Sequence, residues 1–314
     1  MSDRTVPIPA PEPISGFEEA PSRALQTLAP SAIRDAVVLI KPEITFLVVL
    51  SALAGFALGT PQGPDVLVLL ATLLSVAMLS AGGAVLNHVM ERDVDAAMHR
   101  TATRPLPSGR VPVSTATYWG VGLVAAGAGL LCPVTNWLAA ALGLLTVALY
   151  LGVYTPLKRH TTFNTLVGTI PGALPALGGY AAATGHLAAP GWAAFALLTA
   201  WQLPHFLAIA WMYRKDYARG GFAMMTVNDT SGRRTAFWIA LTTILTIAAS
   251  LLPLRTSGLG WGYAVVALLL GAYLVRPVVA FARERSNAHA RAVLMASVFY
   301  VPLLVIALVL FAWE

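Results

Sequence analysis

The chain has 314 residues, of which 57% are hydrophobic and only 11% are charged. Because a soluble domain carries about 25% charged residues, this composition excludes an ordinary soluble enzyme and indicates an all-α polytopic membrane protein. The single cysteine excludes an intrachain disulfide, and the net charge of +6 comes without the basic and aromatic interleaving that is typical of nucleic-acid binding.

The first 30 residues are rich in proline and polar side chains and contain no apolar run of the kind found in a signal peptide. This composition predicts a disordered cytoplasmic tail for residues 1–30. Residues 31–314 are expected to form one transmembrane domain, because apolar runs near the ~20-residue length that spans a bilayer recur from residue 37 to the end.

The positions of these apolar runs and of the breaks between them predict nine transmembrane helices in one bundle. We expect them in chain order at residues 37–59, 66–90, 113–132, 137–154, 164–185, 191–212, 235–254, 261–280 and 291–313.

The basic residues gather at one end of this predicted bundle. All of the 20 lysines and arginines except Arg255 fall on the side of the tail. By the positive-inside rule this side faces the cytoplasm, so we expect an inner-membrane protein with its N-terminus inside and its C-terminus outside. Most of the acids share that side, and the charged cytoplasmic loops are therefore expected to form an active-site cap.

The segment after the second predicted helix, LNHVMERDVDAAMHRTATRPLPSGRV, is the most highly charged. If the helix continues through it, Asn87, Glu91 and Asp95 recur at every fourth residue and share one face, while Asp93 points away. An amide and two carboxylates are hard oxygen ligands that suit Mg²⁺. The alternative is that the acids only solvate the end of a helix.

Two further loops on the same side carry charge. The segment WQLPHFLAIAWMYRKDYARGGFAMM adds Asp216 and Arg219, and YTPLKRHTTFN adds Lys158 and Arg159. Arginine and lysine side chains match the oxygens of a phosphate. The three loops together predict metal ligands at Asn87, Glu91, Asp95 and Asp216, catalytic residues in that set and Lys158, and diphosphate contacts from Arg100, Arg104, Lys158, Arg159 and Arg219.

These motifs resemble a known family. The Asn-x-x-x-Glu-x-x-x-Asp pattern followed by TATRPLPSGRV is similar to the intramembrane prenyltransferases related to 4-hydroxybenzoate polyprenyltransferase. Within that family, the YTPLKRHTTFN and WQLPHFLAIAWMYRKDY segments resemble the haem O synthases, and the likeness runs from about residue 37 to the end. Two positions depart from the family pattern: Glu91 stands where many members have Asp, and Gly220 stands where a second acid often follows Asp216.

The resemblance implies a reaction and its participants. A haem O synthase transfers the farnesyl group of farnesyl diphosphate to a vinyl group of haem B, with addition of water, and uses Mg²⁺. His205 is then expected to contact haem, through iron or a propionate, although a diphosphate contact or a purely structural role is also open. Haem A synthase or oxidase assembly proteins are the partners that the resemblance implies.

Two competing functions are open. The first is prenylation of another acceptor, such as an aromatic acid or a quinone precursor, and the Pro-His-Phe and Asp-Tyr motifs of the sixth-helix segment disfavour it. The second is a transporter whose acids bind a cation. Transporters place ionisable residues near the middle of the bilayer, whereas the charges here gather at one membrane face.

Overall fold

The computed structural model describes residues 32–314, so the tail predicted for residues 1–30 lies outside the described part. Within it, nine helical segments are long and apolar enough to cross a membrane. They are α3 (Pro42–Gly59), α4 (Val66–Met90), α6 (Val113–Val134), α7 (Trp137–Ala148) with its extension to Leu157, α9 (Asn164–Thr184), α10 (Ala189–Met212), α12 (Arg233–Ser250) with α13 (Leu252–Ser257), α14 (Trp261–Arg283) and α15 (Asn287–Ala312).

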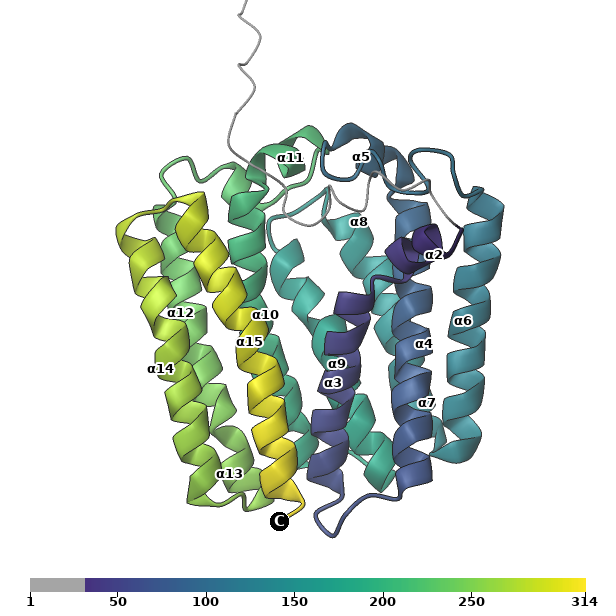
Figure 1. The fold of residues 1–314 in the computed structure, drawn as a ribbon, viewed down its shortest axis with the longest axis vertical. Coiled ribbons are helices and arrows are strands. Elements are labelled where there is room, and N and C mark those ends of the chain that lie inside the picture. The colour runs from purple at the N-terminus through teal and green to yellow at the C-terminus, as the bar shows by residue number, and fades with distance from the viewer. Residues whose placement is uncertain (1–31) are drawn as a thin grey trace, which may run out of the picture.

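The long helices stand side by side as one bundle (Figure 1). At one end, two short helices, α5 (Arg92–Ala97) and α11 (Arg214–Arg219), lie across the bundle. The opposite end carries α13, the connection between α3 and α4, and the C-terminus. The charged loops predicted from the sequence therefore do form a cap over one end.

The predicted spans agree with the observed helices to within a few residues, with one correction. The first span was expected to run unbroken from residue 37, but a separate helix, α2 (Ala32–Ile40), precedes α3. Lys41 between them has a left-handed backbone with φ 48° and ψ 67°, a conformation that is uncommon for a residue with a side chain. Pro42 disfavours helical geometry at the residue before it, so the break falls at Lys41.

The fourth span continues beyond its predicted end through a π-helical turn, η1 (Leu149–Tyr154), and the short helix α8 (Thr155–Leu157). The amide of Thr155 donates to the carbonyl of Tyr150, five residues earlier, in place of the usual four. A π-turn adds one residue to the helix and shifts the facing of every side chain that follows it, and such turns are frequent at functional sites.

Helices α3 and α9 approach each other through two glycines. A methyl group on Gly55 of α3 would collide with the carbonyl of Ala176, and one on Gly179 of α9 would collide with the carbonyl of Ala52. In a membrane, helices associate by packing rather than by hydrophobic burial, and small residues allow the backbones to come close. This contact packs α3 directly against α9, and both helices contribute residues to the cavity of the candidate active site.

We predict that Gly179→Ala destabilises the protein because the added methyl has no room against the backbone of α3. Forced overpacking of this kind costs about 1–3 kcal/mol. Thermal unfolding in detergent, followed by circular dichroism, should show a lower midpoint for Gly179→Ala. The matched control is Gly122→Ala on α6, where nothing lies within 4 Å of the added methyl. Equal midpoints for the two variants would contradict this account.

Candidate active site

A cavity of about 1180 Å³ opens beneath the cap, between α3, α4, α7, α9 and α10. Its upper wall carries charged side chains of the loops that follow α4 and α8, among them Glu91, Asp95 and Lys158. Lower down it is lined by apolar and small residues, among them Val76, Leu79, Leu131 and Gly143. A polar head above an apolar body matches a ligand that has a charged group attached to a hydrocarbon chain.

Asn87, Glu91 and Asp95 do lie on one face, as their spacing predicted. Helix α4 ends at Met90 and α5 follows almost directly, so the helical hydrogen bonds continue across the junction. The amide of Glu91 donates to the carbonyl of Asn87 at 2.9 Å, and the amide of Asp95 donates to the carbonyl of Glu91 at 2.7 Å. All three side chains are buried and line the cavity.

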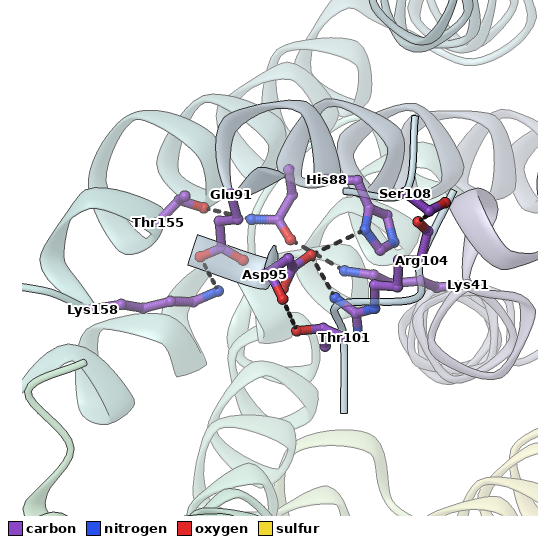
Figure 2. A network of polar contacts seen from close by, with 10 residues as sticks. Lys41, His88, Glu91, Asp95, Thr101, Arg104, Ser108, Thr155 and Lys158 are labelled. Atoms are coloured by element: carbon purple, nitrogen blue, oxygen red, sulfur yellow. Dashed lines mark hydrogen bonds and ion pairs between the residues drawn. The ribbon is translucent and has the colours of Figure 1, made fainter. Parts of the chain in front are cut away.

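Each of these three side chains is paired with a cation from a different segment (Figure 2). The Lys41 ammonium donates to Oδ1 of Asn87 at 3.1 Å. The Lys158 ammonium donates to Oε1 of Glu91 at 2.9 Å. The Arg104 guanidinium donates to Oδ2 of Asp95 at 2.9 Å. We call these six residues the oxygen–cation cluster.

Asn87 is oriented by hydrogen bonds on both sides of its amide. Its Nδ2 donates to the hydroxyl of Thr155 at 3.1 Å, and that hydroxyl donates in turn to the carbonyl of Tyr150 at 2.9 Å. The π-turn brings the carbonyl of Tyr150 within reach of the Thr155 hydroxyl as well as the Thr155 amide. Because the hydroxyl proton is donated there, the hydroxyl can only accept from Nδ2 of Asn87. The oxygen of the amide is therefore the atom presented to the cluster.

The protonation states in the cluster follow from burial and neighbouring charge. Burial acts to raise the pKa of Asp95, but the neighbouring His88 ring and the charge of Arg104 outweigh it and lower the pKa below its usual value. Burial acts to lower the pKa of Lys158, but Tyr154 and the carboxylate of Glu91 outweigh it and raise the pKa. Asp95 and Lys158 are therefore charged at neutral pH.

Lys41 behaves differently from the other two cations. Burial lowers its pKa to about 7, and the positive charges of Arg104 and Lys158 add to the effect. The ammonium form of Lys41 is thus less stable than that of Lys158. An anion bound beside Lys41 would stabilise its ammonium form.

His205 lines the cavity wall away from the cluster, on α10. Its ring packs against that of Trp201, with 5.1 Å between the ring centroids and 31° between the planes. Its Nδ1 lies 2.9 Å from the hydroxyl of Ser297 on α15. The predicted haem contact is thus exposed to the same cavity as the predicted metal and diphosphate residues.

The remaining predicted residues divide into two groups. Arg100 lines the cavity with its guanidinium 4.8 Å from the centre of the Tyr213 ring. Three others do not line it: Arg159 is exposed, and Asp216 and Arg219 pair with each other at 2.7 Å. The geometry therefore gives no support to the prediction that Asp216 binds metal, and this stays a prediction from the sequence.

Two residues of the site were missed by the sequence reasoning. In the sequence, Lys41 is only one of the basic residues on the side of the tail, although a single lysine that interrupts an apolar run just before a proline is itself a signal. His88 lies next to Asn87 and off the face shared by Asn87, Glu91 and Asp95, yet its Nδ1 lies 3.6 Å from Oδ2 of Asp95. The seven-residue spacing of His88 and Asp95 is two helical turns, which could have placed them on one face.

The oxygen–cation cluster fits Mg²⁺ as a shared ion. Within residues 32–314, no three Asp, Glu, His or Cys side chains are grouped as a metal site by themselves. Asn87, Glu91 and Asp95 offer one amide oxygen and two carboxylates, and Mg²⁺ commonly takes one or two carboxylates and completes its shell with water and substrate phosphates. The donor set therefore suits a metal that arrives with a diphosphate.

Comparison with known proteins identifies the family. The model of the UbiA prenyltransferase family matches residues 48–313. The chain belongs to this family. A relative from Salinibacter ruber named protoheme IX farnesyltransferase is 52% identical over 279 residues, which is 89% of this chain and 98% of the relative. A protein of the same name from Solibacter usitatus is 44% identical, over 86% of this chain and 96% of its own length.

Solved structures of UbiA proteins share the fold. A UbiA homologue from Archaeoglobus fulgidus bound to DMAPP and Mg²⁺ superposes with a TM-score of 0.63 at 18% identity, covering 87% of this chain and 99% of the homologue. Family membership and the nine apolar helices of the described region together make this chain an integral membrane prenyltransferase.

We predict that Asp95→Asn weakens Mg²⁺-dependent prenyl diphosphate binding and lowers turnover by about 10²–10³-fold, the usual cost of losing one electrostatic contact in an active site. Asparagine keeps an oxygen for Arg104 but removes the charge. Asp93→Asn is the control, because the Asp93 side chain is 85% exposed and pairs with Arg92, which is itself exposed. Equilibrium binding of radiolabelled farnesyl diphosphate with and without Mg²⁺ measures the effect, and equal losses at both positions would contradict it.

Proposed function

We propose that this protein transfers the farnesyl group of farnesyl diphosphate to a vinyl group of haem B, with addition of water, to give haem O and diphosphate. The oxygen–cation cluster at the head of an apolar cavity is the observation that carries the proposal. Two relatives at 52% and 44% identity are protoheme IX farnesyltransferases by name, which supports haem as the acceptor. His205 in the cavity wall supplies a group suited to that acceptor.

In this proposal Asn87, Glu91 and Asp95 hold Mg²⁺ together with the diphosphate. When bound, the ion neutralises charge on the diphosphate oxygens and orients the leaving group. The Mg²⁺ bound with DMAPP in the Archaeoglobus fulgidus homologue supports a metal of this kind.

The cations of the cluster would then stabilise the departing diphosphate. In the described structure Lys158 and Arg104 pair with Glu91 and Asp95, respectively. Both cations line the cavity beside the predicted metal ligands, where the diphosphate of the substrate would bind. Arg100 and Lys41 line the same end of the cavity. In a site that excludes most water, such fixed charges stabilise a developing oxyanion more strongly than solvent does.

Bond making and breaking follow from that stabilisation. The bond between the allylic carbon and the diphosphate oxygen breaks, and its electron pair leaves with the diphosphate. The π electrons of the haem vinyl group form the new carbon–carbon bond to the allylic carbon. Water then adds to the cation left on the former vinyl group and loses a proton, which leaves the hydroxyethylfarnesyl substituent. The apolar body of the cavity keeps other water from the allylic cation.

The decisive experiment is an assay with the purified full-length protein in lipid. Haem B, farnesyl diphosphate and Mg²⁺ should together yield haem O, detected by mass, and omission of Mg²⁺ with a chelator present should abolish it. A parallel reaction with 4-hydroxybenzoate in place of haem tests the aromatic-acceptor alternative. Prenylated 4-hydroxybenzoate without haem O would overturn the proposal in favour of that alternative.

We propose that the cap faces the cytoplasm, with the chain in the inner membrane, the N-terminus inside and the C-terminus outside. The distribution of basic residues supports this orientation, since they gather at the capped end. Farnesyl diphosphate is a soluble substrate and would enter from that side. The product would pass to a protein that oxidises or incorporates haem O, such as a haem A synthase or an oxidase assembly protein.

The orientation predicts opposite labelling of two introduced cysteines. Cys132 is exposed and must first be replaced by serine. His160→Cys lies in the exposed loop after α8 at the capped end, and Gln62→Cys lies in the exposed connection between α3 and α4 at the other end. An impermeant maleimide applied to intact spheroplasts should label position 62 and spare position 160, and inverted vesicles should reverse the result. The opposite pattern would place the cap outside the cytoplasm.

A further inference from the structure

One serine of α15 contacts two of the aromatic side chains that α10 presents at the cavity wall, Trp201 and His205. Ser297 is fully buried. The indole nitrogen of Trp201 donates to the backbone carbonyl of Ser297 at 2.8 Å. The Nδ1 of His205 lies 2.9 Å from the hydroxyl of Ser297. Trp201 and His205 are one helical turn apart, so a single residue on a neighbouring helix orients both rings.

The hydroxyl proton of Ser297 is already used. The Ser297 hydroxyl donates to the carbonyl of Leu294 at 2.7 Å, and a carbonyl can only accept. With its one proton committed, the hydroxyl must accept in its contact with His205. The Nδ1 of His205 therefore carries the ring proton, and its Nε2 carries the lone pair.

The free nitrogen of His205 is the one available to a ligand. No hydrogen bond to Nε2 is formed within residues 32–314, and His205 lines the cavity whereas Ser297 lies behind it and does not. A lone pair repels the oxygens of a propionate or a diphosphate, which are acceptors themselves. It attracts a metal ion, for which neutral imidazole is the commonest protein ligand.

We propose that Ser297 is a positioning residue that holds His205 in the Nδ1-protonated tautomer, so that Nε2 ligates the iron of the porphyrin acceptor. The inference rests on the proposed function and selects among the contacts considered for His205. Histidines that bind metal generally donate their second ring N–H to a carboxylate, carbonyl or water, which fixes the ring and the tautomer. Here a serine hydroxyl, itself held by Leu294, fills that position, and the Trp201 ring limits rotation of the imidazole.

The test compares haem B with protoporphyrin IX, which has the same vinyl and propionate groups but no iron. Wild-type protein in lipid should bind haem B at least about tenfold more tightly and shift its Soret band, because loss of a metal contact or of its orienting partner typically changes affinity by about 10–100-fold. His205→Ala should remove the preference for the iron porphyrin and the Soret shift. Ser297→Ala should reduce both while binding of protoporphyrin IX is retained.

Ser297→Ala removes the contact with His205 but keeps the one with Trp201, because the Trp201 indole donates to the backbone carbonyl of residue 297. Ser250→Ala is the matched control. Ser250 is also fully buried, and its hydroxyl likewise donates to a carbonyl three residues earlier, that of Ile247, but no histidine contacts it. Its porphyrin preference should equal that of the wild type.

A measurement on the unmodified protein reads the tautomer directly. Protein labelled with ¹⁵N at its six histidines should show, for the resonances that disappear in His205→Ala, a protonated Nδ1 and an unprotonated Nε2. A proton on Nε2, equal affinity of the wild type for the two porphyrins, or an unchanged Soret band in Ser297→Ala would each overturn the inference. If the protein forms haem O but binds haem B and protoporphyrin IX equally, the proposed function stands and the role of Ser297 and His205 is wrong. If it prefers haem B but forms no haem O, the proposed reaction is wrong and the iron contact stands.

Discussion

The structure depends on the need to neutralise two carboxylates beneath the cap. An unpaired charge in a buried site costs several kcal/mol, so Glu91 and Asp95 require cations whenever no ligand is present. Those cations come from segments far apart in the chain: Lys158 follows α8, and Arg104 precedes α6. Lys41, at the break between α2 and α3, completes the set through Asn87. Charge pairing thus closes the end of the bundle, whereas its body is held by helix packing and by a few interhelical hydrogen bonds such as that from Trp201 to Ser297.

The same pairing explains how a stable empty site can also bind a charged substrate. A diphosphate that arrives with a divalent ion brings one partner for the carboxylates and another for the cations. Each internal ion pair can then be exchanged for a contact with the ligand, and no charge needs to be left unpaired during the exchange. The weakly basic Lys41 adds to this, because its ammonium form gains most from an incoming anion. The cluster therefore serves stability and recognition with one set of side chains.

The features that could be predicted from the sequence are those set by residues close together in the chain. Spans such as α4 were predictable because twenty apolar residues have few alternatives in a membrane, and the shared face of Asn87, Glu91 and Asp95 followed from helical spacing alone. Contacts between distant segments produce no comparable pattern in the sequence. Lys41 reaches Asn87 across 46 residues, and Ser297 reaches His205 across 92. No periodicity within either segment encodes these contacts. The pairing of Asp216 with Arg219, three residues later, is by contrast local and within reach of helical spacing.

The π-turn at η1 makes the site depend on the number of residues in a helix as well as on their identity. Thr155 and Lys158 follow this turn and must face Asn87 and Glu91, respectively. Removing one residue from η1 (Leu149–Tyr154) would restore ordinary α-helical bonding and turn everything after it by about 100°. Thr155 would then lose its contact with Asn87, and Lys158 would leave the cavity, although neither residue had been altered. A comparison that counts only matching residue types would therefore overlook a deletion that empties one wall of the site.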